Sequence, residues 1–149
     1  MCRESYSFDV SKKSSIHGLN RGSKKKNSLM SHSSSTIWIH YTWTTWEEQP
    51  LITPANRKKI YQYLHQEFTS CGCIVRIING PPGSVECLFL LNPKKSLDDI
   101  IKMVKGSTSH HISQEDLTPG KFAWQKSYEA NGVSESLLRK VFREIKKLK

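Results

Sequence analysis

The chain has 149 residues, which is the length of one domain, and only 36% of them are apolar. Lys and Arg total 23 against 13 Asp and Glu, so the net charge is +10 and predicts an acidic partner such as nucleic acid. No run approaches the ~20 apolar residues of a membrane span, and residues 1–20 lack the apolar core of a secretory signal. These features argue against a membrane-spanning protein, and with no secretory signal they predict a cytoplasmic chain with reduced thiols.

The chain divides near residue 35. Residues 1–35 are rich in Ser and hold seven basic residues against two acidic ones, with scattered apolar residues and no sustained period. Such a segment buries too little surface to offset its ordering entropy, so we expect a disordered basic tail. Residues 36–149 carry the periodic apolar patterns of a folded domain.

Residues 37–44 alternate β-branched and aromatic residues, which predicts a strand buried on both faces. Thr53 and Pro54 follow as the N-cap and first position of a helix, and Gly72 is suited to end it in the left-handed conformation. The apolar face of this helix consists of Ile60, Leu64 and Phe68.

Two further strands are predicted over residues 73–78 and 85–91, joined by a turn at residues 79–83. Ser96 then caps a second helix, with Asp99 as the capping acid three residues later. The buried stripe of this helix consists of Leu97, Ile100, Ile101 and Val104.

A loop with Gly106, Pro119 and Gly120 is expected to lead to a weaker strand at residues 122–128, and Ser134 caps the last helix. The apolar face of that helix consists of Leu138, Val141, Ile145 and Leu148. The order β-α-β-β-α-β-α predicts an α+β fold: a ferredoxin-like split β-α-β antiparallel sheet with two helices on one face, plus a C-terminal helix.

The four cysteines are Cys2, Cys71, Cys73 and Cys87. They contain no C-x-x-C pair, and their spacing excludes a zinc finger. Cys71 and Cys73 could form half of a metal site with His110 and His111, but the spacing favours two small residues at a helix end.

Several short motifs occur in a fixed order along residues 36–149, at 37–40, 78–80, 82–86, 96–102 and 105–109. The most specific is GKFAWQKSY at 120–128, followed by VSES at 133–136. In this order and spacing they resemble the insertion sequence 200-like transposases, the single-tyrosine HUH transposases of bacterial mobile elements. The resemblance implies metal-assisted strand transfer on single-stranded or hairpin DNA by a homodimer in the bacterial cytoplasm.

Members of that family bind a divalent metal, Mg²⁺ or Mn²⁺, through a His-hydrophobic-His motif and a glutamine, and they attack DNA with a helical tyrosine. The resemblance aligns the histidine positions with Ser84 and Glu86, the tyrosine with Glu144 and the glutamine with Leu148. Shifting the last helix by two residues would place Phe142, which has no hydroxyl, at the tyrosine position. We therefore expect a degenerate member that has no cofactor and no strand cleavage, because Ser is a poor ligand and no tyrosine remains.

Two alternatives remain open. Glu86 and Glu144 could rebuild a metal site in an active transposase, or the chain could be a non-enzymatic dimerisation module or pseudogene product. Met30 also resembles the natural start of family members, so residues 1–29 are a hypothetical upstream extension.

Surviving DNA binding would use cations along the folded part. The candidates are Arg57, Lys58, Lys59, Lys94, Lys95, Lys102, Lys105, Lys121, Lys126, Arg139, Lys140 and Arg143, with Lys146, Lys147 and Lys149 beyond them. For any single lysine a solvated surface charge is the simpler interpretation. His40 on the first strand is expected to be a satisfied sheet histidine rather than a ligand.

Overall fold

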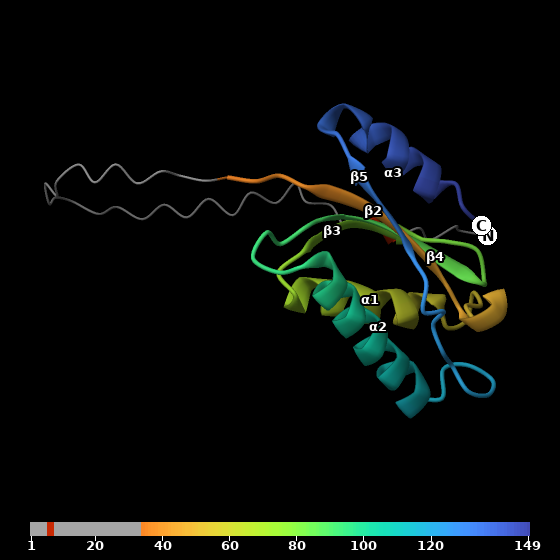
Figure 1. Ribbon diagram of the computed structural model, residues 1–149. Coiled ribbons are helices and arrows are strands. Elements are labelled where there is room, and N and C mark those ends of the chain that lie inside the picture. The colour runs from red at the N-terminus through yellow and green to blue at the C-terminus, as the bar shows by residue number, and fades with distance from the viewer. Residues whose placement is uncertain (1–5, 8–33) are drawn as a thin grey trace, which may run out of the picture.

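The computed structural model describes residues 6–7 and 34–149 (Figure 1). The strands are β1 (Tyr6–Ser7), β2 (Trp38–Thr44), β3 (Ile74–Asn79), β4 (Ser84–Leu90) and β5 (Glu129–Val133). The helices are α1 (Arg57–Ser70), α2 (Leu97–Gln114) and α3 (Leu138–Lys146). The predicted tail at 1–35 and the start at Met30 lie, apart from residues 6–7 and 34–35, outside the described residues.

The strands form one sheet in the order β1-β3-β4-β2-β5, and every neighbouring pair is antiparallel. Helices α1 and α2 cover one face of this sheet, and α3 lies over the other (Figure 1). The predicted ferredoxin-like plan with an added C-terminal helix is therefore confirmed, with β1 pairing at the outer edge of β3.

The two faces of β2 are buried to different degrees. Ile39, Tyr41 and Trp43 are buried in the main core under α1 and α2. Trp38 and His40 alternate with them on the α3 side and are only half-buried. The prediction that both faces are fully buried is wrong, because the short helix α3 leaves part of its face exposed.

Helix α1 begins later than predicted. The Thr53 carbonyl accepts hydrogen bonds from the amides of Asn56 (3.2 Å) and Arg57 (2.8 Å), and the Asn56 side chain accepts one from the Thr53 amide. These bonds form a separate turn around Pro54, so regular helix starts only at Arg57. The predicted end is confirmed, since Gly72 follows the helix with φ +79°.

Helix α2 is capped as predicted, because the Ser96 hydroxyl accepts a bond from the Asp99 amide at 3.1 Å. The helix then continues through Gly106 to Gln114, so the predicted loop at Gly106 is wrong. A mid-helix glycine costs about 1 kcal/mol. Burial of Thr108 and Ile112, two and six residues later, offsets this cost.

The last strand is also placed differently from the prediction. Residues 122–128 form no regular strand, and only Trp124 bridges to Thr45 at the end of β2. Phe122 and Trp124 are buried core residues, and the Trp124 indole donates to the Thr108 hydroxyl on α2 at 2.9 Å. The edge strand is β5 instead, which has few apolar residues and so gives no strand signal in the sequence.

Candidate functional site

The two positions aligned with the family's histidines lie on β4, near the centre of the sheet. Glu86 has Thr42 of β2 and Asn79 of β3 as its Cα partners, and Ser84 has Thr44. Both side chains are half-buried and alternate with the core residues of β4. They therefore lie on the sheet face that α3 covers.

The Glu86 carboxylate is engaged by a histidine from the neighbouring strand. His40 Nε2 lies 2.7 Å from Glu86 Oε2, and the two side chains are 24% and 23% exposed. This contact confirms the expectation that His40 is a satisfied sheet histidine. It also places an imidazole on this face, but on β2 rather than on β4.

The C-terminal end of α3 is fixed beside Glu86 by Asn79. The buried Asn79 amide donates to the carbonyls of Ile145 at 2.9 Å and of Leu148 at 3.0 Å. From the sequence, Asn79 was expected only as part of the turn at residues 79–83. A polar residue between the apolar strand and the Gly-Pro-Pro-Gly turn is the signal that could have indicated its role.

The positions aligned with the nucleophile, on α3, and with the glutamine, just after α3, contact residues other than Glu86. Glu144 is 58% exposed and forms an ion pair with Lys140, one turn earlier, at 3.9 Å. Leu148 packs at the edge of the small apolar cluster of Ile77, Leu88 and Ile145. The helix is thus in place on this face, while its aligned side chains face solvent or apolar neighbours.

The donors on this face do not fit a divalent metal ion. Ser84 offers a weakly binding hydroxyl, Leu148 has no donor side chain, and the Glu86 carboxylate is paired with His40. Within residues 6–7 and 34–149, no three His, Cys, Asp or Glu side chains gather in a way that could hold a metal.

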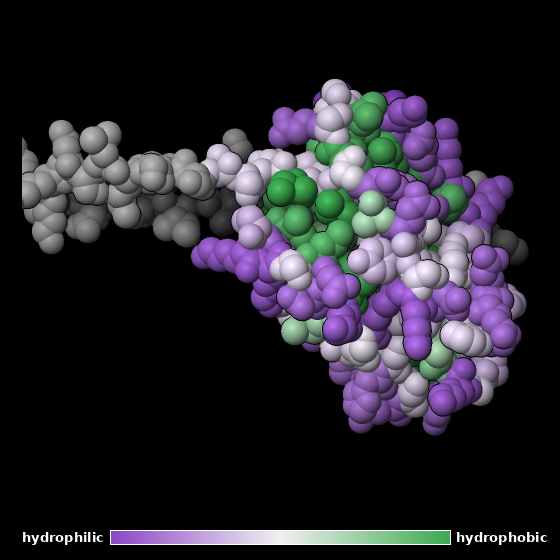
Figure 2. All heavy atoms as spheres, in the orientation of Figure 1, coloured by the Kyte–Doolittle hydropathy of each residue, from purple (hydrophilic) through white to green (hydrophobic). Residues whose placement is uncertain are grey.

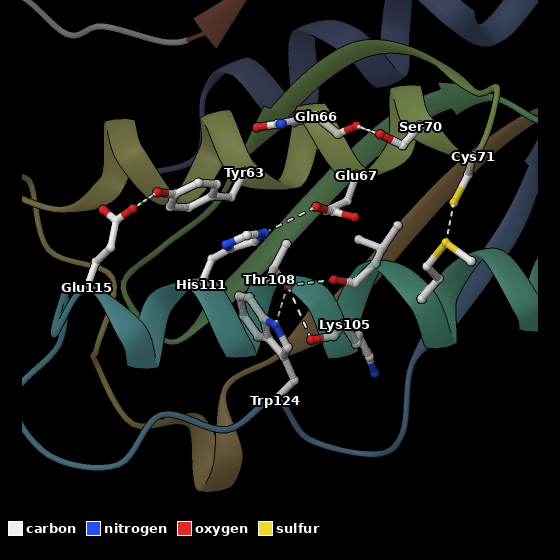
Figure 3. A network of polar contacts seen from close by, with 12 residues as sticks. Tyr63, Gln66, Glu67, Ser70, Cys71, Lys105, Thr108, His111, Glu115 and Trp124 are labelled. Atoms are coloured by element: carbon white, nitrogen blue, oxygen red, sulfur yellow. Dashed lines mark hydrogen bonds and ion pairs between the residues drawn. The ribbon is translucent and has the colours of Figure 1, made fainter.

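The cysteines and histidines of the alternative metal site also contact other residues in the structure. Cys71 Sγ contacts Met103 Sδ at 3.5 Å, while His111 Nε2 lies 3.5 Å from Glu67 Oε1 and stacks on Tyr63 (Figure 3). Burial raises the pKa of the Cys71 and Cys73 thiols. Both cysteines are therefore core thiols at the end of α1, as the spacing favoured.

The predicted DNA-binding cations do not form one stripe. The groups at 57–59, 94–95 and 102–126 lie on the α1/α2 side of the molecule or on its connecting loops, whereas 139–143 lie on α3. Over residues 138–149 six basic side chains face one acid, and all of the basic ones are exposed. Hydrophilic side chains accordingly follow the outer edge of α3 (Figure 2).

Several of these cations already have protein partners, and Lys140 is paired with Glu144 as described above. Lys59 Nζ lies 3.3 Å from Glu115 Oε2. Lys105 Nζ donates to the carbonyls of Gln125 at 2.8 Å, Lys126 at 3.3 Å and Ser127 at 3.1 Å. Desolvation lowers the pKa of Lys105 to about 8. Its ammonium therefore holds the 125–127 segment against α2.

No helix in the described part of the chain is both long and apolar enough to cross a bilayer. The fold and the α3 face define a ferredoxin-like α+β protein whose C-terminal helix is fixed over the centre of the sheet. Comparison with protein families matches residues 33–147 to the family described as "Transposase IS200 like". The chain therefore belongs to the IS200-like transposase family.

Solved structures share this fold. A candidate transposase from Deinococcus radiodurans R1 is similar with a TM-score of 0.60 and 20% identity, over 82% of this chain and 95% of that one. The REP-associated tyrosine transposase bound to a REP hairpin is similar with a TM-score of 0.55 and 7% identity, over 83% and 68%. Among curated proteins, none matches the chain.

Proposed function

We propose that this protein binds single-stranded or hairpin DNA, as a homodimer in the bacterial cytoplasm, without cutting it. The observation that carries the proposal is the position of α3 together with the side chains on its exposed surface. The helix keeps its place over the sheet through Asn79, but its outer surface presents Arg139, Lys140 and Arg143 and no tyrosine. This arrangement supports a binding surface in place of a nucleophile.

The charge on α3 supports DNA as the partner. Exposed Lys and Arg side chains bind phosphates by displacing condensed counterions, a contribution that is independent of sequence. Phosphate contacts of this kind need no metal and no leaving group. The related transposase seen with a REP hairpin supports a hairpin as the form of DNA to test first.

The face opposite the main core supports the absence of cleavage. Strand transfer in this family needs a metal at the scissile phosphate and a tyrosine to form a stable link. Glu86 is paired with His40, and Glu144 is paired with Lys140. A carboxylate nucleophile would form an acyl phosphate, which hydrolyses readily, so Glu144 does not replace the tyrosine.

Binding is tested by fluorescence anisotropy of a labelled DNA hairpin and of a single strand at increasing salt. We expect log affinity to fall linearly with log salt concentration. The variant R139A/R143A should lose about tenfold in affinity and show a shallower slope, because each lost phosphate contact reduces the slope by about one. The variant K94A/K95A removes the same charge from an exposed loop and should lose much less.

Cleavage is tested separately with the same hairpin, labelled at its 5′ end, in Mg²⁺ and in Mn²⁺. We expect neither a shortened strand nor a protein–DNA adduct on a denaturing gel. A nick that disappears in E86Q would instead establish the rebuilt metal site. Light scattering with and without DNA tests the homodimer, and salt-insensitive or absent binding would favour the dimerisation module.

A further inference from the structure

Three sulfur-bearing side chains lie where the end of α1 meets the first half of α2. Cys71 follows α1 directly, Cys73 precedes β3, and Met103 is on α2. Cys71 Sγ contacts Met103 Sδ at 3.5 Å (Figure 3). Because α1 and α2 cover the sheet face opposite α3, this group is separate from the Glu86 position and from the α3 cations (Figure 1).

The spacing of the Cys71 and Met103 sulfurs is close to that of two ligands on one metal ion. The bond from zinc, a first-row metal, to a thiolate is about 2.3 Å long, so two sulfurs at tetrahedral positions lie about 3.8 Å apart. The contact of 3.5 Å therefore has to widen by only about 0.3 Å. Met103 is 48% exposed, so its side chain has room for this movement.

Hydrogen bonds hold the turn that carries the two cysteines. The Cys73 amide donates to the Phe68 carbonyl at 3.0 Å, and the Asn92 side chain donates to the Cys71 carbonyl at 2.9 Å. Gly72 between them has φ +79°, and a Cβ there would lie 2.6 Å from Asn92 Nδ2. The turn is thus fixed before a ligand arrives, which lowers the ordering cost of binding.

The two thiols influence each other's ionisation. Burial raises the pKa of the Cys73 thiol, and the neighbouring Cys71 raises it further. Burial also raises the pKa of Cys71, whereas Lys95 acts to lower the pKa of both. Both groups are therefore protonated at neutral pH, and a metal ion has to displace a proton from each thiol that it binds. The Lys95 charge favours the thiolates that remain.

The ligand types select a soft metal ion. Thiolate and thioether sulfur together suit Cu(I), whereas carboxylate and carbonyl oxygens suit Mg²⁺ and Mn²⁺. The thioether also distinguishes this set from the Cys and His sets that hold zinc. The exposed side chain of Met103 gives an ion a path from solvent to Cys71, which is only 1% exposed.

We propose that Cys71, Cys73 and Met103 bind one Cu(I) ion. The ion bonds to the two cysteine sulfurs and to the Met103 thioether, and each thiol releases its proton to solvent, so no group is oxidised or reduced. Release of these protons makes the affinity rise with pH. The site lies away from the α3 surface proposed to bind DNA, so copper binding does not depend on that proposal.

The test is a competition for Cu(I) between the reduced full chain and the chromophoric chelator bicinchoninate, in the absence of oxygen. We expect the chain to take up one equivalent of Cu(I), so the absorbance of the chelate falls. X-ray absorption of the bound copper should show sulfur neighbours only. Tight binding should also raise the melting temperature, since the ion binds the folded state.

Variants assign the ion to the three sulfurs. Met103→Leu replaces the thioether by an apolar side chain of similar volume at an exposed position, so the fold should remain. It should lower Cu(I) affinity at least about tenfold, and Cys71→Ser should lower it further. Met30→Leu and Cys2→Ser are the matched controls, because they remove one thioether and one thiol outside the described residues. Both should bind Cu(I) as the natural chain does.

Three outcomes would overturn the site. The first is a natural chain that takes no Cu(I) from bicinchoninate. The second is equal affinity of the natural chain and Met103→Leu, which would remove the thioether from the ligand set. The third is a loss of binding in Cys2→Ser without a loss in Cys71→Ser, which would assign the ion to the N-terminal residues.

Discussion

The two faces of the sheet differ in how many large side chains they bury. Under α1 and α2, large side chains such as Trp43, Phe68 and Phe89 are almost completely buried in one cluster. Under α3 the fully buried apolar cluster among the described residues consists of Ile77, Leu88 and Ile145, beside the half-buried Glu86 and His40. Residues that specify the fold are therefore concentrated on one face, and the positions that the resemblance aligns with the family's chemistry lie on the other. Chemical positions can consequently change while the scaffold remains.

The largest effect is expected on the α1/α2 face. Phe68 is fully buried, and its ring centroid lies 4.6 Å from that of Phe89. Phe68→Ala should lower the free energy of unfolding by about 3–5 kcal/mol, because it removes apolar contacts and leaves a cavity. Urea denaturation measures the change. A loss as small as that of an exposed control such as Gln62→Ala would contradict the difference between the faces.

A smaller loss is expected where α3 is attached. Asn79→Ala leaves the carbonyls of Ile145 and Leu148 without their donor, which should cost about 1–3 kcal/mol. The loss should be local, so hydrogen exchange should accelerate in α3 and remain slow in β3 and β4. Asn131→Ala is the control, because the exposed Asn131 side chain donates to the nearby Glu129 carboxylate and not to α3. Unchanged exchange in α3 would show that Asn79 does not anchor the helix.

Most of this fold could be predicted from the sequence, because its elements are marked by local periodicity and caps. Ser96 and Gly72 act through neighbours in the chain, and both predictions were confirmed. The end of α2 was predicted too early, at Gly106. Glycine disfavours helix locally, but the burial of Ile112 against the rest of the core outweighs this, and such a tertiary contact cannot be seen in the local sequence.

The sequence could indicate which positions align with the family's site, but it could not indicate which side chains contact one another there. The pair His40–Glu86 joins residues 46 apart, and the Asn79–Ile145 bond joins residues 66 apart. A single sequence carries no periodic signal for such pairs. The alternation of β4 does place Ser84 and Glu86 on one face, so it predicts that the two positions aligned with the family's histidines share a face.

Histidines introduced at positions 84 and 86 would test whether these two side chains can bind one metal ion on the α3 face. In S84H/E86H two imidazoles would lie two residues apart on the same face of β4, so both could ligate one divalent ion, which imidazole does less strongly for Mn²⁺ than for Zn²⁺ or Ni²⁺. We expect Mn²⁺ to bind this variant at least about tenfold more tightly than the natural chain, measured by calorimetry. S84H alone is the control with one imidazole. Equal Mn²⁺ binding by all three proteins would mean that the side chains at 84 and 86 do not converge.

The smallest effect concerns Lys105 on the α1/α2 side and depends on pH. Desolvation lowers the pKa of Lys105 to about 8 in the folded chain, against an ordinary value of 10.5. Between these values the unfolded chain binds more protons than the folded one, so stability contributed by this group rises with pH. The unfavourable burial of the charge is fully present below pH 8 and is relieved toward pH 10.5.

Replacing Lys105 removes this dependence. The difference in unfolding free energy between the natural chain and Lys105→Met should shift in favour of the natural chain as pH rises from about 8 to about 10. Urea denaturation of both proteins across this range measures it, and Lys102→Met controls for the loss of one exposed charge. Parallel pH profiles for the natural chain and Lys105→Met would mean that the ammonium is solvated. In that case the Lys105 ammonium would not hold the segment at 125–127 against α2 through its three carbonyl contacts.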